Sequence, residues 1–274
     1  MNQSFVKYSA LGNDYIVVDP NFSDIEITEE SIKNICDRHN GPGSDGILYG
    51  PTSLDDLTLR IFNPDGSECE KSGNGIRIFS NYLYDNNYVN TSPFELKLRD
   101  EDIVVTPINA SDGIFKVRMG KVRPGRLAGS EYPHSFVGRE ISFEGSSFTG
   151  SFIDVGNPHM VLETSTLDTE TVKSLGPYIS NHEMFVNRTN VQFCRILDPS
   201  NIEIEIYERG AGYTLASGSS SCAAVAALYL QGKVENEVKV SMPGGDLLVE
   251  IDSENYVYLI GSSKFIYSGN LGRK

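Results

Sequence analysis

Residues 60–75 read RIFNPDGSECEKSGNG, and residues 205–220 read EIYERGAGYTLASGSS. Each stretch begins as a segment typical of a β-strand, passes through a glycine-bearing turn and ends in a Ser-Gly-polar motif ahead of a segment with helical character. Ser72 follows Asn63 by nine residues, and Ser217 follows Glu208 by nine residues. The shared order and spacing predict an internal repeat, which we interpret as two related lobes that face each other.

Short alternating strands outnumber helices in the rest of the chain. We expect strands at residues 5–8, 15–19, 57–62 and 115–119, and helices at residues 29–38, 76–84 and 222–231. This mixture indicates an α+β fold. The glycine-rich stretch 120–129 predicts a crossover between an N-terminal lobe, residues 1–119 completed by residues 263–274, and a C-terminal lobe of residues 120–262.

The composition restricts the classes of function. The 274 residues carry a formal net charge of −14 and an isoelectric point near 4.7. Because a field of this sign repels phosphate, we expect neither nucleic acid nor a membrane as a partner. An N-terminus without a secretion signal and the absence of an apolar run of 18 residues predict a cytoplasmic protein. The scattered cysteines predict neither disulfides nor a metal site.

The two Ser-Gly motifs suit the binding of a small anion. A helix start offers backbone N–H groups without intrahelical partners, and glycine lets an anion approach that backbone closely. Ordinary N-capping by serine, which stabilises a helix by about 1 kcal/mol, is the better explanation of either motif taken alone. The duplication favours a binding role, in which Ser72 and Ser217 are presented to one bound carboxylate.

Further motifs resemble one family along nearly the whole chain. They are LGNDY at 11–15, CDRH at 36–39, GSDG at 43–46, RIFN at 60–63, DGSE at 65–68, GNG at 73–75, GNPH at 156–159, NV at 190–191 and ERGAG at 208–212. Their order and spacing resemble those of the diaminopimelate epimerases.

The resemblance implies two pseudo-symmetric lobes, each a mixed β-sheet wrapped around a central helix, with a ligand in the cleft. It implies a homodimeric isomerase of lysine biosynthesis that uses no cofactor and no metal, in which one side chain removes the α-proton and another returns a proton to the opposite face. The implied catalytic residues are Ser72, Ser217, His159 and Glu208. The implied substrate-binding residues are Asn13, Asn63, Gly73, Asn74, Asn157, Asn190, Glu208, Arg209, Gly218 and Ser219.

The sequence departs from this family at the two acid/base positions, where the family has cysteine and this chain has Ser72 and Ser217. A thiol has an ordinary pKa of about 8.5, and that of an alcohol is several units higher. Each unit of mismatch costs about 1.4 kcal/mol, so without activation of the hydroxyls the site should bind better than it turns over. Ser220 and Ser221 depart as well, from Gly and usually Ala, which favours a natural serine branch over deliberate replacement of the cysteines.

Three functions remain open from the sequence. The first is an epimerase or racemase acting at the α-carbon of diaminopimelate or a related amino acid. The second is a ligand-binding homologue without catalysis. The third is a serine esterase with His159 as base, which is disfavoured because the chain has no Gly-x-Ser-x-Gly nucleophile elbow.

Overall fold

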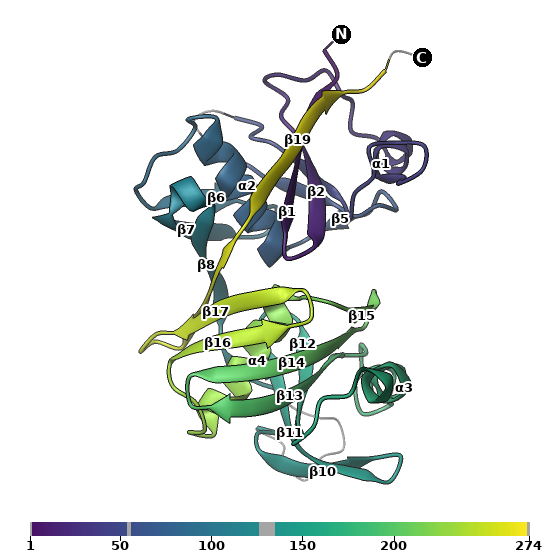
Figure 1. Ribbon diagram of the computed structural model, residues 1–274, viewed down its shortest axis with the longest axis vertical. Coiled ribbons are helices and arrows are strands. Elements are labelled where there is room, and N and C mark those ends of the chain that lie inside the picture. The colour runs from purple at the N-terminus through teal and green to yellow at the C-terminus, as the bar shows by residue number, and fades with distance from the viewer. Residues whose placement is uncertain (1, 54–55, 126–134, 273–274) are drawn as a thin grey trace. The chain divides into compact units, whose positions relative to one another are not determined.

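A computed structural model of the chain describes residues 2–53, 56–125 and 135–272 (Figure 1). The chain divides into two compact units, of which unit 1 is Met1–Val117 with Gly261–Lys274 and unit 2 is Arg118–Ile260. Strands outnumber helices in both, which confirms the α+β class. Residues 126–129 of the predicted crossover lie outside the described residues. Across the described ranges, no helix is both long enough and apolar enough to span a membrane.

Unit 1 contains a six-stranded sheet in the order β19-β1-β2-β3-β4-β5. Its bounds are β1 Ser4–Ala10, β2 Asn13–Val18, β3 Ile47–Tyr49, β4 Arg60–Phe62, β5 Glu68–Cys69 and β19 Lys264–Asn270. Only β2 and β3 pair in parallel, and the other neighbours are antiparallel. Since β19 pairs along β1, the C-terminal strand completes the N-terminal sheet.

The rest of unit 1 consists of two helices and a smaller antiparallel group of strands. Their bounds are α1 Glu29–Cys36, α2 Gly73–Asp85, β6 Phe94–Lys97, β7 Asp102–Asn109, the 3-10 turn η1 Ala110–Asp112 and β8 Ile114–Lys121, which continues into unit 2. Every residue of α2 from Asn74 to Leu83 is buried, and the helix contacts β1 and β2. It is therefore the central helix of the unit.

Unit 2 contains a larger mixed sheet in which β10, β11, β12, β13, β14, β16, β17 and β18 follow one another. Its elements are β9 Arg123–Pro124, β10 Arg139–Phe143, β11 Ser146–Asp154, β12 Pro158–Glu163, α3 Thr169–Ser180, β13 Asn190–Asp198, β14 Asn201–Glu208, β15 Gly212–Thr214, α4 Gly218–Leu230, β16 Glu237–Met242, β17 Gly245–Ile251 and β18 Tyr256–Ser262. The β12–β13 and β14–β16 pairs are parallel.

The core of unit 2 forms around α4. Residues Cys222 to Leu228 of this helix are all 0% exposed, and the helix contacts β11, β12, β13, β14, β16 and β17. A helix that is small and apolar on all sides has no solvent face, so it can be enclosed by a sheet. The expected wrapping of a sheet around a central helix is therefore present in each unit.

The observed helices differ from the predicted ones at their starts and in number. α2 begins at Gly73 rather than Ile76, and α4 begins at Gly218 rather than Cys222, because the Ser-Gly motifs themselves form the first turns. The prediction omitted α3, whose interior contains Gly176 and Pro177. Both residues are read as helix breakers, yet the helix continues through them, capped by Asp168.

Candidate active site

Ser72 and Ser217 occupy equivalent positions as N-caps of the central helices of the two units. Ser72 Oγ accepts a hydrogen bond from Gly75 N at 3.1 Å, and Ser217 Oγ accepts one from Ser220 N at 3.4 Å. The first helical bonds are Ile76 N to Ser72 O and Ser221 N to Ser217 O. The capping interpretation is thus confirmed.

Capping leaves the same pair of backbone donors at each helix start. The N–H groups of Gly73 and Asn74 in α2, and of Gly218 and Ser219 in α4, precede the first helical bond and are not used by the capping serine. These are the four amides expected from the sequence to bind substrate. Each pair lies at the positive end of a helix dipole, where an anion is stabilised.

The two serine hydroxyls have different side-chain partners. Ser72 Oγ lies 3.3 Å from the hydroxyl of Tyr15, a residue of β2 that is 7% exposed. Ser217 hydrogen-bonds to the carboxylate of Glu208, at the end of β14, and this bond lowers the Glu208 pKa less than burial raises it. Ser72 therefore sits beside a phenol, whereas Ser217 sits beside a carboxylate whose affinity for a proton is increased.

In unit 1, Asn13 and Asn74 belong to one chain of hydrogen bonds. Arg77 Nη2 donates to Asn74 Oδ1 at 2.8 Å, Asn74 Nδ2 donates to Asn13 Oδ1 at 3.1 Å, and Asn13 Nδ2 donates to Asp45 Oδ2 at 3.0 Å. A guanidinium can only donate and a carboxylate can only accept, so the two ends determine the orientation of both carboxamides. One N–H of each asparagine remains for a ligand.

A charged cluster supports the β1–β2 turn that carries Asn13. Asp14 Oδ2 pairs with Lys7 Nζ at 2.6 Å, and Asp14 Oδ1 and Asp45 Oδ1 both pair with Arg38 Nη2 at 2.6 Å. Burial tends to raise the Asp14 pKa, but hydrogen bonds from Arg38 and Lys7 outweigh it and lower that pKa to about 2. The Asp45 end of the amide chain is therefore held by an ionised network.

Asn63 and Asn190 use their side chains within the fold. Asn63 Nδ2 donates to Ser67 Oγ at 3.0 Å, across the turn between β4 and β5. Asn190 Nδ2 donates to the Pro158 carbonyl at 3.1 Å, and Asn190 Oδ1 accepts from Arg209 N at 3.1 Å. Asn190 thus joins three segments that carry site residues, and Asn63 is not brought into contact with the other predicted residues by any hydrogen bond of the described chain.

His159 is fully buried on β12, and its Nε2 lies 2.8 Å from Asn157 Oδ1. Burial is the main cause that lowers the His159 pKa to about 3; the nearby Arg209 adds to the decrease, and Gln192 opposes it. The ring is therefore neutral near pH 7 and cannot act as an imidazolium acid. Within unit 2, no hydrogen bond among the described residues joins His159 to Ser217.

Two of the four cysteines, Cys36 and Cys194, are buried thiols that the pKa shifts characterise. Burial raises the pKa of Cys36 and, more strongly, that of Cys194, so neither is a reactive thiolate near pH 7. Ser72 and Ser217 are the hydroxyl groups at the two helix starts, and they are therefore the candidate acid/base groups.

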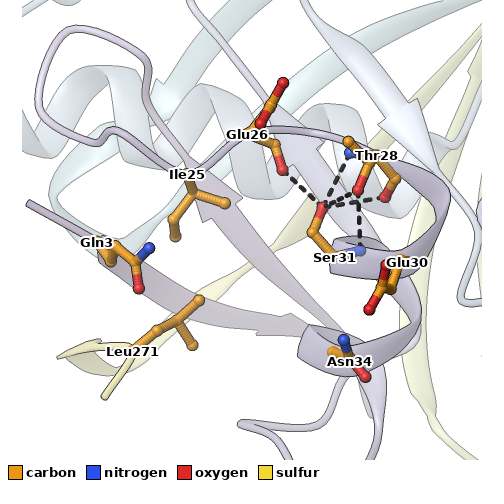
Figure 2. A pocket seen from close by; sticks show the side chains of 8 residues that line it. All are labelled: Gln3, Ile25, Glu26, Thr28, Glu30, Ser31, Asn34 and Leu271. Carbon is orange, nitrogen blue, oxygen red and sulfur yellow. Dashed lines mark hydrogen bonds between the residues drawn. The ribbon is translucent and has the colours of Figure 1, made fainter. Parts of the chain in front are cut away.

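A hollow of about 270 Å³ in unit 1 lies away from these residues (Figure 2). It is lined by Gln3, Ile25, Glu26, Thr28, Glu30, Ser31, Asn34 and Leu271. Figure 2 shows the Ser31 hydroxyl bonded to Glu26 O and to the Thr28 side chain, in the capping box of α1. This hollow contains none of the predicted site residues, and its serine and threonine are used in the helix cap.

Several residues that organise the site were not singled out from the sequence. Tyr15 and Asp45 stand inside motifs that were noticed, but a strand tyrosine and a turn aspartate have many ordinary explanations. Arg77 and Gln192 lie in segments that look like a plain helix and a plain strand. Only the fold, which buries both at 0% exposure beside the asparagines and His159, reveals their partners.

Comparison with known proteins agrees with the motifs. The family described as diaminopimelate epimerase matches residues 5–124 and 151–266. The chain is 43% identical over 273 residues to diaminopimelate epimerase 2 of Nostoc sp., covering 97% of this chain and 95% of that protein. It is 35% identical to the diaminopimelate epimerase of Desulfitobacterium hafniense, covering 97% of each.

A solved structure shares the fold at much lower sequence identity. The phenazine biosynthesis protein of the PhzF family from Bacillus anthracis aligns with a TM-score of 0.68 at 15% identity, over 100% of both chains. The family matches most of this chain, and the two relatives are 43% and 35% identical over 97% of it. This chain therefore belongs to the diaminopimelate epimerase family.

Proposed function

We propose that this chain epimerises diaminopimelate, or a closely related α-amino acid, by two-base proton transfer with Ser72 and Ser217 as the proton-carrying groups. The observation that carries the proposal is the equivalence of the two helix starts. Each combines a capping serine hydroxyl with two unused backbone N–H groups, Gly73 and Asn74 in one unit and Gly218 and Ser219 in the other. Such a pair of donors suits a carboxylate and the negative charge that develops next to it.

The proposed reaction has two steps, removal of the α-proton and delivery of a proton to the opposite face of the carbon. Ser217 Oγ takes the α-proton as its own proton passes to Glu208, and the Cα–H bond breaks. Ser72 then gives its proton to the opposite face of the carbon and is left as an alkoxide, which the Tyr15 hydroxyl and Gly75 N–H stabilise as donors. Proton exchange with solvent returns both groups to their starting state. The reverse reaction runs these steps backwards: the Ser72 alkoxide takes the α-proton, and Ser217 gives its proton to the opposite face of the carbon while it receives one from the protonated Glu208.

The raised Glu208 pKa supports the first transfer. A serine hydroxyl is a poor base on its own, and a neighbouring acceptor with an increased proton affinity reduces the mismatch. The neutral His159 takes no proton in this scheme. Asn13, Asn74 and Asn157 are proposed to hold the polar groups of the amino acid.

The test is deuterium incorporation at the α-carbon from ²H₂O, measured by proton NMR with LL- and meso-diaminopimelate. We expect exchange and interconversion in the natural chain, and faster exchange in Ser72→Cys/Ser217→Cys because a thiolate is a better base near pH 7. No exchange in either protein would reject the proposed function.

A second function is a binding protein without catalysis. The observation that favours it is the intact set of backbone donors beside serines that lack a thiol. Calorimetric binding of diaminopimelate to the natural chain, with exchange seen only after the cysteines are introduced, would establish this alternative.

A further inference from the structure

Ser220, Gln192 and His159 form a continuous buried polar chain in unit 2. All three are 0% exposed. Gln192 Nε2 lies 3.0 Å from Ser220 Oγ, and His159 Nε2 lies 2.8 Å from Asn157 Oδ1. The Gln192 carboxamide also lies next to the His159 ring. In this orientation of the Gln192 amide, His159 Nδ1 and Gln192 Oε1 have no hydrogen-bond partner among the described residues.

The direction of each hydrogen bond in this chain follows from which atoms can donate and which can accept. Suppose that Gln192 Nε2 donates to Ser220 and Gln192 Oε1 faces a proton on His159 Nδ1. The buried Ser220 hydroxyl proton then has no acceptor in the described chain, and His159 Nε2 and Asn157 Oδ1 become two acceptors 2.8 Å apart. Both consequences are unfavourable.

Rotation of the Gln192 amide by 180° removes both problems. The Ser220 hydroxyl donates to Gln192 Oε1, Gln192 Nε2 donates to His159 Nδ1, and His159 Nε2 donates to Asn157 Oδ1. Every contact then joins a donor to an acceptor, and the two unpartnered buried atoms are satisfied. The NH₂ group and the oxygen of a carboxamide are similar in size, so the rotation leaves the packing unchanged.

Ser220 is a feature of unit 2 with no counterpart in unit 1. It stands three residues after its capping serine, as Gly75 does after Ser72. A Cβ at Gly75 would lie 3.0 Å from Leu48 Cδ2 and 3.3 Å from Ser72 Oγ, which leaves little space for a side chain. Unit 2 accommodates a hydroxyl at this position, and its side-chain partner is Gln192.

We propose that Ser220 and Gln192 are positioning residues that hold His159 as the neutral tautomer protonated on Nε2, and so keep the Asn157 NH₂ group available to the substrate. Burial of His159, which lowers its pKa to about 3, agrees with a ring that stays neutral. His159 is then a positioning residue too, because it acts through Asn157. Only the last step, contact between Asn157 and an amino acid, rests on the proposed function.

The tautomer can be measured in the ligand-free protein by long-range ¹H–¹⁵N correlation spectra of the histidine rings. We expect the His159 signals of the natural chain to show a neutral ring with the proton on Nε2 and a hydrogen-bonded Nδ1 at pH 6 to 8, a window of about two units. Gln192→Met should remove the Nδ1 hydrogen-bond shift. Ser220→Gly, a smaller change, should move the same signal less.

Gln231→Met is the matched control. Gln231 also hydrogen-bonds a serine hydroxyl, Ser151 Oγ at 3.3 Å, but at the far end of α4. The control should leave the His159 signals unchanged and diaminopimelate binding intact, whereas Gln192→Met should weaken binding by roughly 3- to 10-fold, as expected for one hydrogen bond. A proton on Nδ1 in the natural chain, or His159 signals that ignore both Gln192→Met and Ser220→Gly, would overturn the proposal. Failure of the natural chain to bind diaminopimelate would count against the proposed function. It would not affect the tautomer assignment, which is measured without ligand.

Discussion

At the scale of single residues, the two capping serines are chemically unequal. Ser72 is next to the Tyr15 hydroxyl, and Ser217 is bonded to the Glu208 carboxylate. A carboxylate can accept a proton from a hydroxyl, whereas a phenol serves mainly as a donor that stabilises negative charge on it. Loss of either partner should therefore weaken proton transfer at one serine more than at the other.

Replacement of Glu208 tests the acceptor at Ser217. Burial raises the Glu208 pKa, so the carboxylate form increases over a pH interval that lies above the ordinary one for a glutamate. The α-proton exchange rate should rise over the same interval, and Glu208→Gln should abolish that rise and lower the rate by roughly 100- to 10,000-fold. Deuterium exchange measured from about pH 4 to pH 8 checks this expectation.

Glu205→Gln is the control for this variant. Glu205 lies on the same strand and accepts a hydrogen bond from Thr169 Oγ1 at 3.0 Å. Its replacement should change neither the pH profile nor the rate. A Glu208→Gln protein with the natural pH profile would mean that Glu208 is not the acceptor.

Replacement of Tyr15 tests the donor at Ser72. Tyr15→Phe removes the hydroxyl that lies 3.3 Å from Ser72 Oγ while Gly75 N remains as a donor. We expect the exchange rate to fall by roughly 10- to 100-fold, because a hydrogen bond to a charged oxygen is stronger than one to a neutral oxygen. Tyr88→Phe, which removes a hydroxyl bonded to Asp19 in the same unit, should have no effect on exchange.

At the scale of secondary-structure elements, one serine serves both a helix and the proposed chemistry, and substitutions can separate the two roles. Ser72→Ala removes the acceptor of Gly75 N–H and should lower the free energy of unfolding by about 1 kcal/mol. Ser72→Asn keeps a good N-cap, so it should retain most of the stability yet lose α-proton exchange. Urea unfolding and deuterium exchange, measured on the same samples, give the two quantities.

Thr28→Ala provides the comparison for capping alone. Thr28 caps α1 and accepts from Ser31 N at 3.1 Å, without any contact to the candidate site. It should lose a similar amount of stability with exchange unchanged. Equal exchange in Ser72→Asn and the natural chain would show that Ser72 is only a cap.

The same elements show what the sequence could and could not predict. The Ser-Gly motifs indicated both central helices because a capping serine followed by apolar residues is a local signal. The start of each helix was placed late, since glycine at the first positions hides the first turn. α3 was missed because Gly176 and Pro177 are judged by local propensity, whereas its position is stabilised by packing of Val172 and Ile179 in the core of unit 2.

At the scale of the whole molecule, each unit holds asparagines with a polar chain of its own. In unit 1 the chain runs from Arg77 to Asp45, and in unit 2 it passes through Gln192 and His159. The sequence repeat predicted two related lobes, but the polar chains are not part of the repeat. Their members come from distant segments that only the tertiary structure brings together, so no local spacing could reveal them.

The charged end of the unit 1 chain predicts how this unit responds to acid. The folded-state pKa of Asp14 is lowered to about 2 from an ordinary value of 3.8, so the ionised form is favoured by folding. The resulting stability is complete above the ordinary pKa and is lost as pH falls through the interval between these two values. Allowing for solvent screening, we expect a contribution on the order of 1 kcal/mol.

Asp14→Asn should therefore lower the urea midpoint of the natural chain at neutral pH and reduce its further decline between about pH 4 and pH 2. Hydrogen exchange of the β1 and β2 amides locates the effect in unit 1. Asp56→Asn breaks an exposed ion pair, in which the side chains of Asp56 and Lys97 are 46% and 45% exposed. It should change the urea midpoint little at any pH. If Asp14→Asn and Asp56→Asn respond alike, the charged cluster does not stabilise the turn that carries Asn13. If only Asp14→Asn weakens diaminopimelate binding, the network that resists acid also holds the amide that the proposed reaction requires.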